Sequence, residues 1–159
     1  TPLYSSAASD VYKRQLLDDL GVSYRCLVNE PAVFQEAKEK GITRSMAAVE
    51  YAAKVDGPKL FVFGNAPTSI FKVLDMVEEG SLQPDAVVGV PVGFVGAAES
   101  KLKLHESSVP SIAALGQKGG STIAAAVINA ILYQIKLDTT DYERYSVSDK
   151  KQAPEKGEG

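Results

Sequence analysis

Three glycine-rich segments each follow an apolar run and precede a helical pattern, and they are the parts of this sequence best suited to bind a ligand. They read GNAPT at 64–68, GFVG at 93–96 and GGS at 119–121. Glycine lets a backbone approach a ligand closely, and the start of a helix presents unpaired N–H groups with a partial positive charge. The segments themselves contain no charged side chain. They therefore predict a site built from backbone donors, suited to carboxylates or phosphates.

Two nucleotide-binding motifs are approached but not matched. A phosphate-binding P-loop has lysine directly before its Ser or Thr, whereas Gly120 stands at that place in GQKGGST. Gly89, Gly93 and Gly96 do not have the spacing of a dinucleotide-binding fingerprint, and no acidic residue ends the next strand to bind a ribose. The sequence thus disfavours nucleotide hydrolysis and dinucleotide binding.

Four reactive side chains stand outside these segments. His105 is the only histidine and follows a helical pattern, where an exposed loop position is expected, so no Ser-His-Asp set can be assembled. Cys26 is expected to be a small core residue, since no histidine is near to activate it. Glu99 could act as a general base, although such a glutamate more often serves the first turn of its own helix. Arg44 adjoins a helix start, where an arbitrary arginine most often makes a surface ion pair.

The elements expected around these residues alternate along the chain. Short apolar runs predict strands at 24–28, 60–63, 86–90 and 112–115. Between them, helical spacing predicts helices at 31–40, from about 45 to 54, from 67 to Gly80, from Ala97 to 104 and at 122–135, with Asn65 and either Thr43 or Ser45 as N-caps. Repeated strand–loop–helix order predicts a doubly wound α/β fold, Rossmann-like and three-layered, with a mainly parallel sheet and helices on both faces. The glycine-rich loops would then share one rim, where open α/β sheets bind ligands.

Length and composition restrict the class of protein. The chain has 159 residues and a net charge of −3, which indicates one domain without the basic patch of a nucleic-acid-binding protein. No apolar run approaches the roughly 20 residues that span a bilayer, so no membrane partner is expected. A single cysteine fits a reducing compartment, which predicts a cytoplasmic location. The sequence contains no cluster of Cys and His with metal-ligand spacing, so no metal site is expected.

The amino-acid sequences of these loops resemble those of a known family. GNAPT, GVPVGFVGAAESK and GQKGGSTIAAAVINA, together with the upstream GITRSMAA, are similar to precorrin-8X methylmutases, also called precorrin isomerases, of cobalamin biosynthesis. The resemblance covers about residues 16–132, and PVGFVGAAESK is long and unusual enough to be specific. It implies a doubly wound α/β homodimer that requires no cofactor.

The resemblance also implies a reaction. Members move a methyl group between neighbouring ring carbons of a corrinoid, converting precorrin-8X or its cobalt form to hydrogenobyrinic or cobyrinic acid, with a histidine as proton donor. The family's histidine belongs to a segment upstream of Leu16 that this sequence does not match, so no catalytic residue is assigned and activity of the chain is in doubt. The implied substrate-binding residues are Thr43, Arg44, Ser45, Gly64, Asn65, Ala66, Pro67, Thr68, Gly93, Phe94, Val95, Gly96, Gly119, Gly120 and Ser121.

The two ends of the sequence differ from the middle. Residues 1–15 do not resemble the family, and SSAASDVYKRQ is interpreted as an assembly artefact joined to a truncated gene, with a real disordered N-terminus as the alternative. Residues 16–135 form the expected partial domain. Residues 136–159 are polar, without apolar period towards the end, and are expected to be disordered.

The residues also allow a second class of function, a binding protein without catalytic activity. A fragment that keeps the anion-binding rim but lacks the acid would be a non-catalytic binding module for a corrinoid or another polycarboxylate. Absorbance separates the two ligands, because a bound corrinoid would colour the protein.

Overall fold

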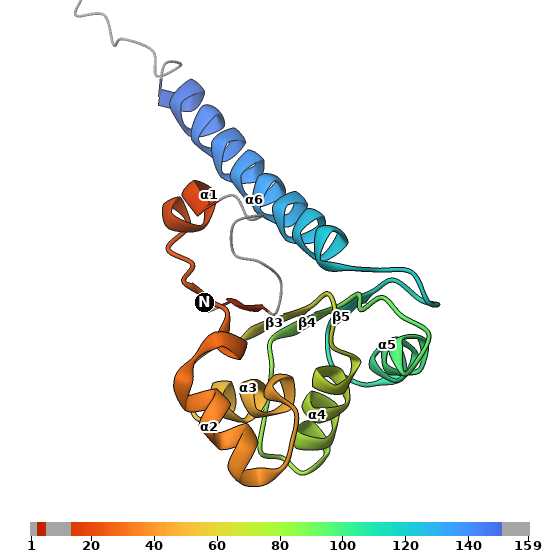
Figure 1. Ribbon diagram of the computed structural model, residues 1–159. Coiled ribbons are helices and arrows are strands. Elements are labelled where there is room, and N and C mark those ends of the chain that lie inside the picture. Colours follow the sequence, from red (N-terminus) through yellow and green to blue (C-terminus); the bar gives the residue numbers. More distant parts are fainter. Residues whose placement is uncertain (1–2, 6–13, 151–159) are drawn as a thin grey trace, which may run out of the picture.

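The fold is a five-stranded parallel sheet between two layers of helices, seen in a computed structural model that describes residues 3–5 and 14–150 (Figure 1). Within the last helix, side chains are described as far as residue 138. The strand order is β2-β1-β3-β4-β5, and every neighbouring pair is parallel. The strands are β1 (Leu3–Ser5), β2 (Tyr24–Arg25), β3 (Leu60–Phe63), β4 (Ala86–Gly89) and β5 (Ser111–Ala113).

The helices divide between the two faces of the sheet (Figure 1). One face carries α2 (Pro31–Lys40), α3 (Arg44–Ala53), α4 (Pro67–Glu78) and α5 (Ala97–Glu106), packed over Phe61, Phe63 and Val87. The other carries α1 (Arg14–Asp19) and α6 (Ser121–Lys150), packed over Val62 and Val88. The predicted doubly wound parallel fold is therefore confirmed, with the 2-1-3-4-5 strand order of flavodoxin-like proteins.

The central strands are buried on both faces because helices cover both. β3 pairs with β4 in the register Leu60↔Ala86 to Phe63↔Gly89. Val62 is fully buried and Phe61 is 1% exposed, although they point to opposite faces. A continuous apolar run such as LFVF is typical of such a strand, and the predicted bounds of β3 are confirmed.

The prediction of a strand at 24–28 was wrong beyond Arg25. Residues Leu27–Asn29 form a short 3-10 helix instead, labelled η2. Leu27 is buried in the cluster beneath α2 and α3, whereas Tyr24 packs on the opposite face of the sheet. The alternating pattern therefore reflects contacts with two separate layers rather than one continuous pleat.

Both ends of the chain contain structure that the sequence analysis did not predict. β1 lies within residues 1–15 and occupies the sheet between β2 and β3. The origin of that stretch stays a prediction, tested by sequencing genomic DNA. α6 continues to Lys150, past the end expected at 135, because no Gly or Pro interrupts 121–150. Its exposed part includes an i,i+4 hydrogen bond, Gln134 Nε2 to Asp138 Oδ1, of 3.0 Å. Residues 151–159 of the expected disordered tail lie outside the described chain.

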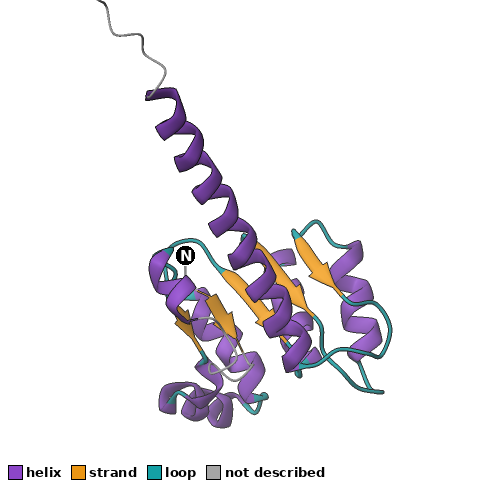
Figure 2. Cartoon of the chain, turned by 90° about the horizontal axis from the view of Figure 1, so that it is seen from above, coloured by secondary structure: helices purple, strands orange, loops and turns teal. Residues whose placement is uncertain are grey.

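A view from above shows α6 lying across the sheet with its first turns and projecting beyond it with its last (Figure 2). The buried residues of the packed part include Ala124, Ala125, Ile128 and Leu132. Alanine lets the helix approach the strands closely. No helix in the described part of the chain has both the length and the hydropathy needed to cross a bilayer.

A group of ion pairs fixes α3 between its neighbours. The Glu50 carboxylate of α3 accepts hydrogen bonds from Lys40 of α2 at 2.5 Å and is 2.7 Å from Lys72 of α4. Glu36 of α2 joins the group through Lys40 at 2.6 Å and Lys54 at 2.8 Å. These bridges tie the C-terminal half of α3 to α2 and α4, and so help to fix the helix whose N-terminus carries Thr43 and Arg44.

We predict that Glu50→Gln removes part of the acid sensitivity of the fold. Burial raises the pKa of Glu50, but its bonds to Lys40 and Lys72 outweigh burial and lower the pKa below the ordinary 4.5. A lowered folded-state pKa contributes stability above 4.5 that is lost as the pH falls through the folded value. Urea titrations at pH 7 and pH 3 should show about 1 kcal/mol less pH-dependent loss for the variant. An identical loss in both proteins would contradict this assignment.

Candidate functional site

The carboxyl ends of β3, β4 and β5 open onto one edge of the sheet, because parallel strands end on the same side. Each is followed by one of the glycine-rich segments, and we call residues 64–68, 91–96 and 116–121 together with 43–45 the rim. All strands are parallel, but β2 is added to one side of β1, and β3, β4 and β5 to the other, so the strand order switches between β1 and β3. Open α/β sheets bind ligands outside the carboxyl ends of their strands at such a switch point, so the rim is the candidate site.

The first and third loops of the rim are in direct contact. The side-chain amide of Asn65 donates to Ser121 Oγ at 2.6 Å. A Cβ at Gly64 would lie 2.7 Å from the Cα of Ser121, closer than side chains tolerate. Glycine is therefore required at 64 for the loop after β3 to meet the start of α6.

The second and third loops are joined through their backbones. Gly120 N donates to Val90 O at 2.8 Å, and Gly93 N donates to Gln117 O at 3.2 Å. A Cβ at Gly119 would lie 2.7 Å from Pro91 O, so this position too requires glycine. The backbones of these two loops lie side by side, which leaves no room for a side chain between them.

The remaining segment, 43–45, joins the rim through Thr43. Its Oγ1 lies 3.5 Å from Thr68 Oγ1 and accepts the Met46 N–H at 3.2 Å, which confirms Thr43 as the N-cap of α3. Gly96 of the second loop lies next to the first loop, since a Cβ at this position would be 3.6 Å from the Pro67 side chain. The structure thus brings together all four segments that the sequence analysis proposed for binding.

The helices that start at the rim leave donors open. Asn65 was predicted to cap α4, and this was wrong: Ala66 is the N-cap residue, with no side-chain cap, while Asn65 binds Ser121 instead. Gly96, the N-cap of α5, likewise has no side-chain cap and has a φ of 74°. First-turn N–H groups without a side-chain acceptor are available to an anion.

The exposed side chains at the rim include two positive charges, Arg44 and Lys118, and an apolar group. The Arg44 guanidinium is exposed, and no described residue binds it, so the alternative of a surface ion pair is not observed among residues 14–138. Phe94 is 88% and Val95 89% exposed, next to the half-exposed Val92. A surface of this kind can bind carboxylates at its donors and an apolar ring at its loop.

Of the other reactive side chains, Glu99 stands next to the rim, whereas His105 and Cys26 lie apart from it. His105 is exposed in the last turn of α5, the end remote from Gly96. Glu99 is exposed in the first turn of that helix, where a carboxylate is favoured by the dipole. Cys26 is half-buried and its pKa is raised by burial, which makes it a poor nucleophile.

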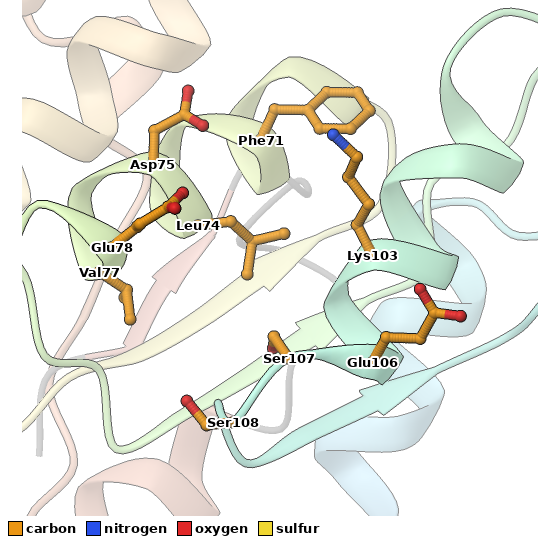
Figure 3. A pocket seen from close by; sticks show the side chains of 9 residues that line it. All are labelled: Phe71, Leu74, Asp75, Val77, Glu78, Lys103, Glu106, Ser107 and Ser108. Carbon is orange, nitrogen blue, oxygen red and sulfur yellow. The ribbon is translucent and has the colours of Figure 1, made fainter.

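A groove of about 480 Å³ between α4 and α5 is a second candidate (Figure 3). Three carboxylates line it, from Asp75, Glu78 and Glu106, while the Lys103 ammonium lies 5.4 Å from the centre of the Phe71 ring. Three carboxylates repel an anionic ligand, so the groove is less suited than the rim to a polycarboxylate. None of the predicted site residues lines it.

The sequence analysis missed one charged residue that lies beneath the rim. Lys101 of α5 is fully buried, and its ammonium donates to Lys118 O in the third loop at 2.7 Å. A signal existed, because Ala97, Ser100, Lys101 and Leu104 follow the spacing of one inward helix face. Within the described residues, no three His, Cys, Asp or Glu side chains gather to hold a metal ion.

Comparison with known proteins identifies relatives of this arrangement. The family model for precorrin-8X methylmutase matches residues 7–134. This range begins nine residues before the boundary expected at Leu16. Cobalt-precorrin-8 methylmutase of Salmonella typhimurium is 53% identical over 82% of this chain and 60% of its own length. That of Methanocaldococcus jannaschii is 44% identical over 73% and 57%. The chain thus spans well under two thirds of these relatives.

Solved structures agree with the sequence relatives. A precorrin-8X methylmutase of Thermus thermophilus superposes with a TM-score of 0.73 at 31% identity, covering 84% of this chain and 66% of that one. A precorrin-8X methylmutase related protein gives 0.71 at 30% identity, with coverages of 83% and 70%. Since the family model matches most of the chain and the relatives share both its sequence and its fold, the chain belongs to the precorrin-8X methylmutase family.

Proposed function

We propose that this chain acts in cobalamin biosynthesis as a precorrin-8X methylmutase, an isomerase that moves a methyl group between neighbouring carbons of a corrinoid ring. We expect the described residues to bind the substrate but to turn it over slowly, because no histidine among them stands at the rim. The observation that carries the proposal is the convergence of segments 43–45, 64–68, 93–96 and 119–121 on one rim. These are the segments whose sequences resemble those of the family. The substrate is precorrin-8X or cobalt-precorrin-8, named by the relatives above.

The surface chemistry of the rim suits such a ligand. A corrinoid precursor carries many carboxylates around a large apolar ring. Uncapped first turns of α4 and α5 and the unpaired Arg44 supply donors for the carboxylates. Phe94 and Val95 supply exposed apolar area for the ring. In this assignment the fifteen residues proposed from the sequence bind and orient substrate, and no metal or cofactor is held by the protein.

We further propose a cytoplasmic homodimer. The support is apolar surface on α6, where Ile123, Tyr133, Ile135 and Leu137 are each more than 40% exposed. Part of this helix projects beyond the sheet (Figure 2). Exposed apolar side chains gathered on one helix can mark an interaction site, and in this proposal a second copy covers them.

A non-catalytic binding module is the second candidate, favoured by the position of His105. The only histidine of the printed sequence is exposed at the far end of α5, so no histidine of residues 14–138 stands at the rim. Such a module would bind a corrinoid without changing its spectrum to that of the isomer. Incubation with precorrin-8X under turnover conditions separates the two functions.

Arg44→Ala should weaken corrinoid binding. A charge-assisted hydrogen bond contributes about 1.5–3 kcal/mol, which corresponds to roughly 10- to 150-fold in Kd. Absorbance titration with hydrogenobyrinic acid measures the effect. Lys38→Ala is the control, because it removes one positive charge from an exposed position on α2, outside the rim. An unchanged Kd in Arg44→Ala would remove this residue from the site.

His105→Ala should change neither binding nor turnover. With a rise of 1.5 Å per residue, His105 lies about 12 Å along the helix axis from Ala97 at the rim. A positioned general acid contributes about 10²–10⁴-fold, so we expect the chain as printed to isomerise precorrin-8X slowly at most. Following the spectrum with and without the substitution tests this. Fast turnover that disappears in His105→Ala would make His105 the acid and overturn the assignment.

A further inference from the structure

The inward face of α5 contains a lysine where apolar or small residues are expected. Ala97, Ser100, Lys101 and Leu104 are the buried residues of this helix, and Lys101 has no exposed surface. Lysine is rarely buried completely unless its charge has a partner. Its place on the face that packs against the sheet therefore requires an explanation.

The lysine side chain reaches the rim. Helical side chains tilt towards the N-terminus of their helix, and the N-terminus of α5 lies at the rim. The Lys101 ammonium accordingly donates to Lys118 O at 2.7 Å, in the loop that continues into Gly119 and Gly120. Lys118 itself is exposed. The thickness of a single residue thus separates the buried charge from the outer surface of the third loop.

The charge is incompletely compensated in the free protein. An ammonium has three donors, and the Lys118 carbonyl is its single partner among the described side chains and backbone of 14–138. No carboxylate of these residues lies within ion-pair distance of it. Burial alone lowers the pKa of Lys101, with no charged neighbour offsetting the effect. By contrast, the neighbouring buried Ser100 has its hydroxyl donor satisfied by Ala97 O at 3.1 Å.

We propose that Lys101 is a positioning residue for an anionic ligand: it holds the third loop through the Lys118 carbonyl and places an uncompensated positive charge directly beneath the rim. A ligand carboxylate bound on the outer side of that loop supplies the missing negative charge. The inference deepens the proposed function and rests on it for the corrinoid nature of the ligand. The carboxylate chemistry follows from the buried charge itself.

The test compares two lysines of one helix. Lys101→Met removes the buried charge and keeps most of the volume. Lys103→Met removes the same charge from an exposed site two residues further along α5, so it controls for net charge. Both variants and the parent chain are titrated with hydrogenobyrinic acid and with citrate, a polycarboxylate without a ring. Thermal unfolding and amide hydrogen exchange of 116–121 are measured on the same samples.

We expect Lys101→Met to weaken hydrogenobyrinic acid binding at least about tenfold, whereas Lys103→Met changes it less than about twofold. The Tm of Lys101→Met should not fall, because replacing a buried charge with an apolar side chain is often neutral or stabilising. Amides of 116–121 should exchange faster without the Lys101 bond. In the parent chain, NMR of the lysine ammonium groups should show the pKa of Lys101 rising on ligand addition, which a purely structural role would not produce.

The outcomes separate the two proposals. Equal weakening by Lys101→Met and Lys103→Met, or none by either, overturns the role of Lys101 while leaving the corrinoid function in place. Citrate binding that depends on Lys101, without corrinoid binding, retains the anion anchor and overturns the proposed function. A parent chain that binds neither ligand overturns both. A fall in Tm with an unchanged ammonium resonance on ligand addition reduces Lys101 to a structural residue.

Discussion

The rim depends on close approach between backbones at Gly64 and Gly119. At Gly64 a Cβ would meet the backbone of Ser121, and at Gly119 it would meet the carbonyls of Val90 and Pro91. These contacts bring the loops after β3, β4 and β5 to one surface, where the bonds of Asn65 and Gly120 then join them. A side chain at either glycine would separate the loops. The proposed binding surface is thus a consequence of backbone packing, and many of its donors are main-chain groups.

Charge distinguishes this surface from the groove between α4 and α5. The groove between α4 and α5 contains the carboxylates of Asp75, Glu78 and Glu106. The rim instead combines uncapped helix starts with Arg44 on its outside and Lys101 beneath it. The two regions share α4 and α5 but differ in which ends and faces of these helices they use. The proposed anionic ligand is therefore better matched by charge to the carboxyl edge of the sheet than to the groove.

The position of Arg44 depends on interactions distant from the rim. α3 packs against α2 and α4 through apolar residues, and Glu50 bridges the same helices through Lys40 and Lys72. Thr43 caps α3 and contacts Thr68 at the start of α4. The helix is thereby held at its N-terminus and along its length. The Arg44 guanidinium is thus carried on a helix held by its neighbours rather than on a free loop.

The sequence by itself determined the parallel α/β class, the strand β3, the starts of α4 and α5 and the four segments of the rim. These follow from local signals, namely apolar runs, helical spacing and glycine-rich breaks, and from loop sequences that resemble those of a known family. Tertiary structure alone decided that β1 lies beside β3, that Leu27 leaves the sheet for a helical turn, and that Asn65 binds Ser121 rather than capping α4. Each of these depends on a partner distant in the chain. The same holds for Lys101, because its burial and its contact with Lys118 arise only when α5 packs beneath the third loop.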